Sequence, residues 1–353
     1  MRNISDIKKE KIAKDWIAEA KRVDSGIFDK ALDYSVSVVS DNLENFRDYF
    51  PSAGGVNGEY QPTDNAGKIL GSDWTSSFWT GMIWLAYELT GEEKFKETGL
   101  HHSESFRERY EKNDILDHHD IGFLYSLSCV AAYKLTGDEF LKETAILAAR
   151  KLLKQYMEKC GALQQWGSPT DVNNQKLGGA IIDGCMNLPL LYWASTMTGD
   201  KEFFDKAYSH IKTAGTYLVR DNGATHQNIK FDVFSGDIID IFTSQGDGNN
   251  DGCWSRGQAW AIYGFMLSYL YTGDKTLVEF AKICANYFLN RLQSIADITK
   301  NYLYTKSESS NALLKAGVYS FKSGLCVNEP TIWGDYFYME ALMRLTHIHR
   351  IFW

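Results

Sequence analysis

Hydrophobic positions along this chain recur at helical spacing and stop at a short repeated phrase. The phrase reads AYELTG at residues 86–91, AYKLTG at 132–137, ASTMTG at 194–199 and SYLYTG at 268–273, with a degenerate copy, LMRLTH, at 342–347. Each copy follows an apolar stretch with the period of an α-helix. The first four copies end in glycine, which adopts the left-handed conformation just past a helix at little cost. The phrase therefore predicts where the apolar helices end.

A more amphipathic segment follows these turns. Asp138 and Asp200 come directly after their glycines, and residues 139–153 then place apolar side chains mainly on one face. The repeating unit is an apolar helix, a tight turn and a helix with one wet face. Such hairpins stack into an open solenoid or a closed ring. Because an open stack would leave a face of the apolar helices wet, we expect a closed all-α toroid, with residues 1–353 forming a single domain.

Strand signals are few in this sequence. Residues 229–234 and 238–242 fit either short strands or loop. Irregular stretches at residues 52–73, 167–179 and 221–253 are longer than ordinary connections between helices, and no Gly/Ser/Pro-rich linker divides the chain. We expect these stretches to be binding loops.

Counting back from the turn glycines identifies the opposite ends of the apolar helices. Sixteen or seventeen residues before the turns stand Trp74, Asp120, Asp183 and Arg256. At ~1.5 Å of rise per residue these positions lie about 25 Å from the turns. If the helices run parallel, an aromatic ring, two carboxylates and a guanidinium meet at one mouth of the ring.

Two interpretations of Asp120 and Asp183 remain open at this level. An aspartate before an apolar helix is commonly an N-cap that accepts a hydrogen bond from a free backbone N–H. Both aspartates, however, stand close to a glycine, which lets a ligand approach the backbone. Two carboxylates in a partly desolvated pocket raise one pKa and leave a protonated acid beside an ionised partner. The spacing favours this general acid/base pair.

Aromatic and polar residues at the same level fit a sugar site. Trp74 and Phe78 are one helical turn apart, as are Arg256 and Trp260. Rings at such spacing are either core or stacking walls for the apolar faces of sugars. The Arg256 fork suits a ligand carboxylate, although it would equally steady one of the aspartates.

Further candidates come from the loops. His226 and Gln245 precede Arg256 and offer neutral hydrogen bonds, while Trp166 and the segment from Trp333 to Tyr336 would complete the wall.

Composition narrows the function classes. Aromatic residues make up 14% of the chain against only five Pro, which fits long helices and a ring-walled pocket. With 37 basic and 45 acidic residues the net charge is −8, so broad binding to nucleic acid or an anionic membrane is not expected. No apolar run approaches the ~18–20 residues of a membrane span. Six scattered cysteines without a C-x-x-C pair and a charged N-terminus predict a cytoplasmic protein with reduced thiols.

Motifs for nucleotide or metal cofactors do not occur in the sequence. It has no G-x-G-x-x-G, Walker, G-x-S-x-G or H-E-x-x-H phrase. We therefore expect neither a cofactor nor a metal.

Five phrases resemble the unsaturated glucuronyl hydrolases, the glycoside hydrolase family 88 enzymes that remove 4,5-unsaturated uronic acid from oligosaccharides left by polysaccharide lyases. They are DWTSSFWTG at 73–81, HDIGF at 119–123, DGCMNLP at 183–189, WSRGQAW at 254–260 and IWGDYFY at 332–338, in order over nearly the whole chain. The resemblance implies an (α/α)6 barrel, whereas the repeats themselves number five.

The resemblance also implies a reaction and a set of site residues. Asp183 matches the general acid/base and Asp120 its assistant. The substrate would be the unsaturated uronic-acid end of a disaccharide or oligosaccharide, whose C4=C5 vinyl ether is hydrated without metal or nucleotide. The residues expected to bind it are Trp74, Phe78, His119, Trp166, His226, Gln245, Arg256, Trp260 and Tyr336.

Alternatives remain within and beyond this family. A sister family acts on unsaturated galacturonyl-rhamnose from pectin, but RGQAW at 256–260 resembles the glucuronyl enzymes more. A toroid sugar epimerase would rely on histidines at the mouth, and a glycan-binding toroid would keep the rings without turnover. Enzymes that prefer sulfated chondroitin disaccharides carry a Ser-x-x-Ser-x-Lys element, of which Ser320 and Ser323 are present while Leu325 replaces the Lys. Lys322 is the residue that would take over its role.

Overall fold

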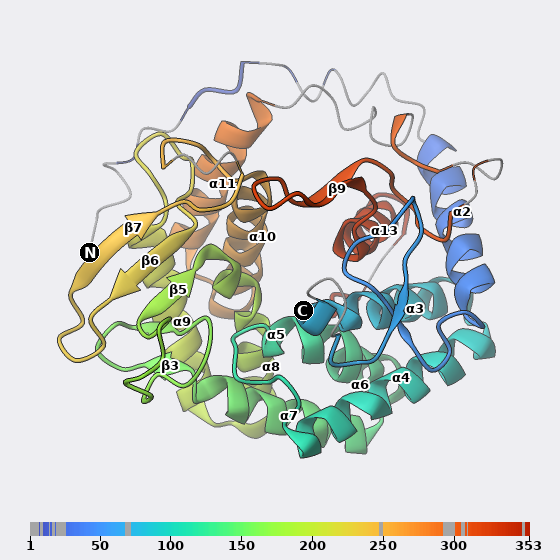
Figure 1. The fold of residues 1–353 in the computed structure, drawn as a ribbon, viewed down its shortest axis with the longest axis horizontal. Helices are drawn as coiled ribbons and strands as arrows, with labels where there is room; N and C mark the ends of the chain where they lie inside the picture. Colours follow the sequence, from blue (N-terminus) through green and yellow to red (C-terminus); the bar gives the residue numbers. More distant parts are fainter. Residues whose placement is uncertain are drawn as a thin grey trace.

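The computed structural model describes residues 7, 10–13, 15, 18, 26–67, 72–246, 250–291, 301–304, 308, 310–347 and 350–353. Figure 1 shows their helices as two concentric layers of a ring. The inner segments are α3 (Ser76–Thr90), α5 (Ile121–Tyr125) continued by the π-helical η3 (Ser126–Val130) and α6 (Ala131–Thr136), α8 (Leu188–Thr198), α10 (Ser255–Thr272) and α13 (Ile332–Thr346). The outer helices are α2 (Gly26–Asn42), α4 (Glu93–Lys112), α7 (Glu139–Leu153), α9 (Lys201–Tyr217) and α11 (Lys275–Leu289). The toroid predicted from the repeats is confirmed.

Burial explains the two layers. Every residue from Leu188 to Ala194 of α8 is buried, whereas α9 buries only one face. The pairs α3 with α4, α8 with α9 and α10 with α11 pack as the predicted hairpins. An apolar helix loses little by being enclosed on all sides, and an amphipathic one covers it while keeping a solvated face.

The repeated phrase ends helices as predicted. Its four glycines adopt left-handed φ values of 68°, 76°, 74° and 68° at Gly91, Gly137, Gly199 and Gly273. After three of these turns an aspartate side chain caps the next helix, namely Asp138, Asp200 and Asp274. His347 in the degenerate copy instead has an extended φ of −136°, in keeping with the absence of glycine there.

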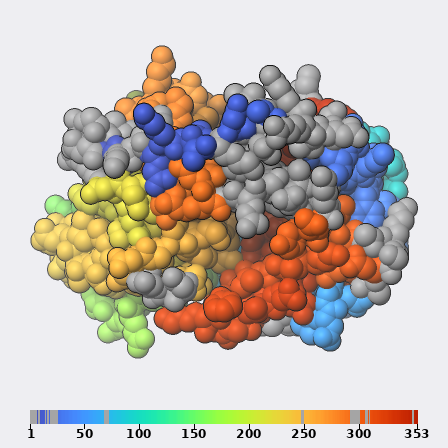
Figure 2. All heavy atoms as spheres, turned by 90° about the horizontal axis from the view of Figure 1, so that it is seen from above, coloured from blue at the N-terminus to red at the C-terminus, as the bar shows by residue number. Residues whose placement is uncertain are grey.

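Short antiparallel strands decorate the ring. They are β1 (Phe50–Pro51) with β2 (Pro62–Thr63), β3 (Tyr156–Met157) with β4 (Ala162–Leu163), the sheet β5 (Gly179–Ile181), β6 (Asn228–Phe231) and β7 (Ile238–Phe242), and the hairpin β8 (Gly317–Ser320) with β9 (Leu325–Glu329). The strand alternative for residues 229–234 and 238–242 is thus confirmed in β6 and β7, although β6 ends at Phe231. The β8–β9 hairpin was not expected from the sequence. Figure 2 shows it on the same side of the molecule as the segment around β7.

The chain end fills the middle of the ring (Figure 1). Trp353 is buried and stacks on Phe337 with ring centroids 5.8 Å apart and planes 6° apart. Its indole N–H donates to Glu340 Oε1 at 3.2 Å. The Lys134 ammonium donates to the carbonyl oxygens of residues 351–353 at 2.7–3.2 Å, which anchors this segment inside the ring.

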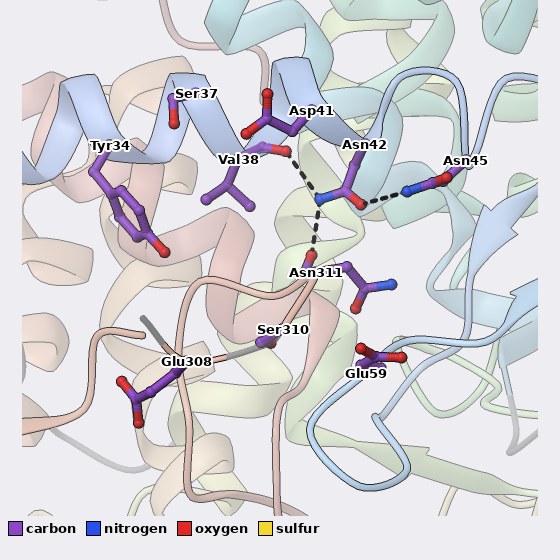
Figure 3. A pocket seen from close by; sticks show the side chains of 10 residues that line it. All are labelled: Tyr34, Ser37, Val38, Asp41, Asn42, Asn45, Glu59, Glu308, Ser310 and Asn311. Carbon is purple, nitrogen blue, oxygen red and sulfur yellow. Dashed lines mark hydrogen bonds between the residues drawn. The ribbon is translucent and has the colours of Figure 1, made fainter. Parts of the chain in front are cut away.

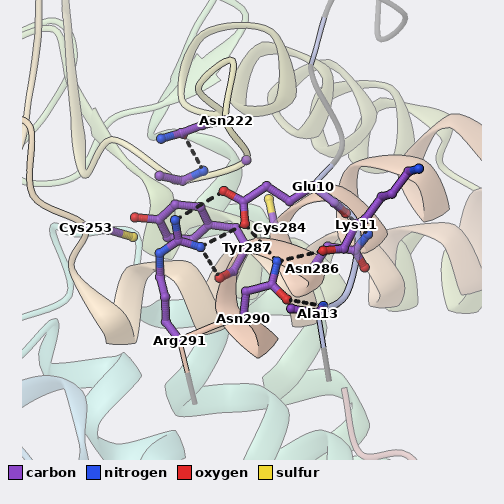
Figure 4. A network of polar contacts seen from close by, with 12 residues as sticks. Glu10, Lys11, Ala13, Asn222, Cys253, Cys284, Asn286, Tyr287, Asn290 and Arg291 are labelled. Atoms are coloured by element: carbon purple, nitrogen blue, oxygen red, sulfur yellow. Dashed lines mark hydrogen bonds and ion pairs between the residues drawn. The ribbon is translucent and has the colours of Figure 1, made fainter. Parts of the chain in front are cut away.

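Residues near the other end of the chain lie along α11. Arg291 Nη1 and Nη2 hold both carboxylate oxygens of Glu10 at 3.0 and 3.2 Å, and the Asn286 and Asn290 amides donate to residues 10 and 11 (Figure 4). In the part of the chain that the structure describes, none of the helices combines the length and apolarity that crossing a membrane would require.

Candidate active site

The N-terminal ends of the inner helices bring the two aspartates together. Asp120 immediately precedes α5, and Asp183 lies in the 3-10 turn η4 (Ile182–Met186) that leads into α8. Arg256 lies in the first turn of α10. The three charges act on one another, since both Asp120 and Arg256 influence the pKa of Asp183. We call this end of the ring the mouth.

Asp183 has the electrostatics of a general acid. Its Oδ1 atom is buried and has no hydrogen-bond partner within the described residues. Burial raises the pKa of its carboxyl to about 7; Arg256 opposes the rise and the negative charge of Asp120 adds to it. A carboxyl group with this pKa is partly protonated near neutral pH and can both donate and accept a proton.

The pKa of Asp120 is shifted in the opposite direction to that of Asp183. Burial alone would raise its pKa, but His119, His118 and the Asn187 amide together lower it. His119 Nε2 lies 3.3 Å from Asp120 Oδ1, and the Asp120 backbone N–H donates to His118 Nδ1 at 3.1 Å. The Asp120 side chain caps no helix, so the N-cap interpretation is wrong for this residue. The two neighbouring carboxyls therefore differ, with an ionised Asp120 beside a protonatable Asp183.

Arg256 sits in an aromatic box. Its Cζ atom lies 4.5 Å from the Trp254 ring centre, 4.8 Å from that of Trp333 and 5.5 Å from that of Tyr319. Nη1 donates to the Tyr319 carbonyl at 3.3 Å. Rings on several sides hold the guanidinium in one orientation and leave its edge to a planar anion.

A hollow of about 440 Å³ opens beside Arg256, and we call it the mouth hollow. Its lining is Gln245, Gly246, Trp254, Ser255, Arg256, Phe288, Val318, Tyr319, Ser320, Phe321 and Trp333. The loop after β7 forms one wall and the β8–β9 hairpin the other, which agrees with their placement in Figure 2. The volume suits a small sugar.

Another hollow, of about 540 Å³, lies between α2 on one side and Glu308, Ser310 and Asn311 on the other (Figure 3). Its lining includes the carboxylates of Asp41, Glu59 and Glu308 but neither Asp120 nor Asp183. The two aspartates do not line the mouth hollow either, but Arg256 does, and its charge acts on Asp183. We therefore assign the site to the mouth hollow and these two aspartates. Within the described residues, no group of three or more His, Cys, Asp and Glu side chains is arranged to hold a metal ion.

Several predicted residues lie at the mouth with unsatisfied polar atoms. The Trp260 Nε1, His226 Nδ1 and Arg256 Nε atoms are buried without a hydrogen-bond partner among the described residues. The Trp260 indole lies near enough to Asp183 to lower the pKa of its carboxyl. Burial, assisted by Arg220, lowers the pKa of His226 to about 4, so this imidazole is neutral. Because buried polar groups are normally paired, these atoms are candidates for contact with a ligand.

Trp74 and Trp166 reach the mouth differently. Trp74 stacks on Trp333 with ring centroids 5.2 Å apart and so belongs to the wall around Arg256. Trp166 lies 4.9 Å from the His118 ring and carries the Lys176 ammonium over its own ring. Trp166 thus packs on His118, the histidine that contacts Asp120. Contact between Trp166 and the substrate stays a prediction.

Two predicted substrate-binding residues belong to the core instead. Phe78 is fully buried and packs edge-to-face on Trp74 and obliquely on Phe123. Tyr336 is also fully buried, and its hydroxyl donates to Glu340. Helical spacing placed both on inner helices correctly, but their side chains pack within the ring and have no surface open to a sugar.

Other residues of the site escaped the sequence reasoning. Trp254 and Asn187 stand inside recognised phrases, yet their roles beside Arg256 and Asp120 had no separate signal. Tyr319 had no signal at all, because it reaches Arg256 from a hairpin distant in sequence.

Comparison with known proteins identifies the family. Residues 57–317 match the model of Glycosyl Hydrolase Family 88. The chain belongs to this family. It is 33% identical over 375 residues to the unsaturated glucuronyl hydrolase of Bacillus sp. (strain GL1), covering 90% of this chain and 97% of the relative. It is 32% identical to the unsaturated chondroitin disaccharide hydrolase of Streptococcus pyogenes serotype M1, covering 92% of each.

Solved structures agree with the family assignment. The crystal structure of the unsaturated glucuronyl hydrolase from Streptococcus agalactiae superposes with a TM-score of 0.90 at 30% identity, covering 98% of this chain and 99% of that one. The family 88 protein is therefore a glycoside hydrolase with the expected (α/α)6-barrel fold, of which the described residues form five inner segments.

Proposed function

We propose that this family 88 enzyme releases 4,5-unsaturated glucuronic acid from the non-reducing end of glycosaminoglycan fragments produced by lyases. The observation that carries the proposal is the Asp183–Asp120 pair, in which one carboxyl has a pKa of about 7 and the other a lowered pKa. The names of its relatives add the substrate class.

Asp183 begins the reaction by giving its proton to C4 of the unsaturated sugar. The electrons of the C4=C5 bond form the new C4–H bond, and the positive charge is shared by C5 and the ring oxygen. Ionised Asp120 offsets this charge. Water then adds to C5, and the Asp183 carboxylate takes up the proton that the water loses. The hemiketal opens when the bond between C5 and the ring oxygen breaks: the C5 hydroxyl becomes a ketone and its proton passes to the ring oxygen. The hemiacetal left at C1 then passes its hydroxyl proton to the glycosidic oxygen, the C1–O bond to the remaining sugar breaks, and C1 becomes an aldehyde.

Arg256 is the proposed partner of the uronate carboxylate. Its guanidinium can bind both oxygens of a carboxylate, and the box of Trp254, Trp333 and Tyr319 sets the direction in which its N–H groups point. Gln245 lines the same hollow, and the neutral His226 offers a hydrogen bond to a hydroxyl. A single guanidinium thus serves a short anionic fragment in an otherwise acidic protein.

The second sugar would rest against the β8–β9 hairpin. Val318 and Phe321 line the mouth hollow with exposed apolar surface, and Arg256 is the cation in its lining. Lys322 is exposed in the adjacent turn, while Leu325 stands where a sulfate-binding lysine is expected. We infer a preference for unsulfated disaccharides, which the ratio of kcat/KM for unsulfated and sulfated chondroitin disaccharides measures directly.

A cytoplasmic location is part of the proposal. All six cysteines are free, and Cys129, Cys160, Cys185 and Cys284 are buried. Thiols held in this way fit a reducing compartment.

Loss of absorbance by the conjugated alkene tests the function. Wild type, Asp183→Asn and a control, Asp205→Asn at an exposed position of the outer helix α9, are incubated with unsaturated chondroitin, hyaluronan, heparin and pectin disaccharides. We expect the absorbance to fall with wild type and the control and to stay constant with Asp183→Asn. Unchanged absorbance of all four substrates with wild type would contradict the proposal, and turnover of the pectin disaccharide alone would move the enzyme to the sister specificity.

A further inference from the structure

A buried histidine behind the site has one ring nitrogen without a partner. His210 lies on α9 and is 2% exposed. Its Nδ1 accepts the backbone N–H of Leu163 at 2.9 Å, so in the neutral ring the proton is on Nε2. That Nε2 atom is buried and has no partner among the described residues. Because a buried donor without a partner is unfavourable, the direction in which this N–H points is informative.

The unpaired nitrogen of His210 points toward the backbone next to Asp183. A Cβ atom built on Gly184 would lie 2.6 Å from His210 Nε2 and 3.5 Å from His119 Nδ1. Two imidazole rings from different parts of the chain therefore lie next to the place that a side chain at residue 184 would occupy. Glycine at this position leaves the space between them open.

His119 is the matching half of this arrangement. It is 1% exposed, and its Nδ1 atom, which faces Gly184, is buried without a partner among the described residues. Its Nε2 atom lies 3.3 Å from Asp120 Oδ1 but outside hydrogen-bond geometry. A small rotation of the ring would align that nitrogen with the carboxylate.

Both rings are neutral at ordinary pH. Burial, with a smaller effect of His119, lowers the pKa of His210 to about 3, and burial also lowers the pKa of His119. A neutral imidazole carries one proton on one of two nitrogens, so a donor at Nδ1 selects the tautomer with the proton on Nε2.

We propose that His210 is a positioning residue of the active site: its Nε2–H faces His119 Nδ1, directly or through one water, and thereby fixes His119 as the Nε2–H tautomer that donates to Asp120. No proton is transferred between His210, His119 and Asp120 in this arrangement. With the other tautomer, a lone pair of His119 would face the Asp120 carboxylate and favour its protonation. Asp120 would then no longer support the protonated form of Asp183. The effect on Asp183 rests on the proposed function, whereas the assignment of the His119 tautomer does not depend on it.

Two substitutions separate positioning from mere structure. In His210→Asn the side-chain oxygen reaches the place of Nδ1 and can still accept the Leu163 N–H, but no donor remains for His119. In His210→Gln the amide nitrogen reaches the place of Nε2 and can still donate to His119, but the bond to Leu163 is lost. A structural role would spare the Asn variant, and a positioning role would spare the Gln variant.

The tautomer is measured by long-range ¹H–¹⁵N NMR of protein with ¹⁵N-labelled histidine, the His119 signals being those lost in His119→Gln. We expect the Nε2–H pattern in wild type and His210→Gln, and a mixed or Nδ1–H pattern in His210→Asn. Turnover of an unsaturated disaccharide should fall about tenfold to a hundredfold in kcat for His210→Asn with KM little changed. It should stay within about threefold of wild type for His210→Gln, even with a lowered Tm.

Three results would overturn the proposal. They are an Nδ1–H pattern of His119 in wild type, a His119 pattern or a kcat in His210→Asn equal to that of wild type, and a loss of kcat in His210→Gln as large as in His210→Asn. Wild-type protein that turns over no unsaturated disaccharide would contradict the proposed function instead, and the NMR experiment would still decide the tautomer.

Discussion

The indole N–H of Trp74 donates to the Tyr319 hydroxyl at 3.0 Å. This bond joins η2 (Ser72–Trp74), at the rim before the first inner helix, to the β8–β9 hairpin. The carbonyl of the same tyrosine accepts a hydrogen bond from Arg256. The hairpin is therefore pinned on both sides of the mouth hollow, and the position of Arg256 depends on it.

Removing that hydroxyl should weaken substrate binding. In Tyr319→Phe the ring and the carbonyl contact with Arg256 remain, but one hydrogen bond worth about 1 kcal/mol is lost. We expect KM to rise about fivefold with kcat nearly unchanged, as measured by initial rates of alkene loss. Tyr302→Phe, at an exposed position, is the matched control and should behave as wild type. A fall in kcat at constant KM would argue against a binding role.

The pH profile should reveal the titration of Asp183. The reaction needs its protonated form, and the pKa of this carboxyl is about 7. We therefore expect kcat/KM to fall above about pH 7, by about tenfold per pH unit once the group is largely ionised. A flat profile from pH 6 to 9 would exclude Asp183 as the proton donor.

The charges of Asp120 and Arg256 should shift the descending limb of the kcat/KM profile, above about pH 7, in opposite directions. The charge of Asp120 raises the pKa of Asp183, so Asp120→Asn should shift the limb to lower pH and also reduce the rate. Arg256 lowers that pKa, so Arg256→Met should shift the limb to higher pH while raising KM. Profiles of kcat/KM for the two variants check both signs. Shifts in the same direction would show that these charges do not control Asp183.

Asp183 should lower the free energy of unfolding at high pH, where its carboxyl group is ionised. Its pKa is raised from 3.8 to about 7 in the folded state, so between these values the unfolded chain ionises the group more readily. Stability from this residue is retained at low pH and falls as the pH rises toward 7. Asp183→Asn should therefore have a higher Tm than wild type at pH 8, with a difference that shrinks toward pH 4. Scanning fluorimetry from pH 4 to 8 measures the difference, and Asp205→Asn, at an exposed position of α9, should show no such trend.

The Trp353 ring should contribute strongly to the free energy of unfolding. It is 1% exposed, stacks on Phe337 and donates to Glu340. Trp353→Ala would leave a cavity in the middle of the ring and cost about 3–5 kcal/mol. Urea denaturation followed by circular dichroism measures the change, and Tyr302→Ala provides an exposed aromatic control. A change in the free energy of unfolding below about 1 kcal/mol would mean that the helical toroid is stable without this side chain.

Part of the fold follows from local rules that the sequence displays. A helix needs an apolar stripe and a terminus, and both are written in short segments, so the turns at Gly91, Gly137, Gly199 and Gly273 were predictable. The degenerate copy shows the limit, because His347 ends its helix in a different conformation. The β8–β9 hairpin lacked a signal, since its short strands are stabilised by pairing and not by a periodic pattern.

The site residues also fall into those whose place the sequence predicted and those whose place it did not predict. Counting along helices brought Asp120, Asp183 and Arg256 to one mouth, because helical rise converts sequence distance into length. Helix periodicity does not give the direction of a side chain relative to distant segments. Phe78 and Tyr336 were therefore expected at the sugar and are found in the core.

The sequence by itself determined the helical hairpins, the family and the residue types at the mouth, since these depend on local order along the chain. Only the tertiary structure decided the electrostatics of the aspartates and the box around Arg256. Burial and neighbours brought from far along the chain separate the two pKa values, and the rings of Tyr319 and Trp333 reach Arg256 only when the ring is closed. Desolvation and Coulomb interactions depend on distance in space, which the linear order does not specify.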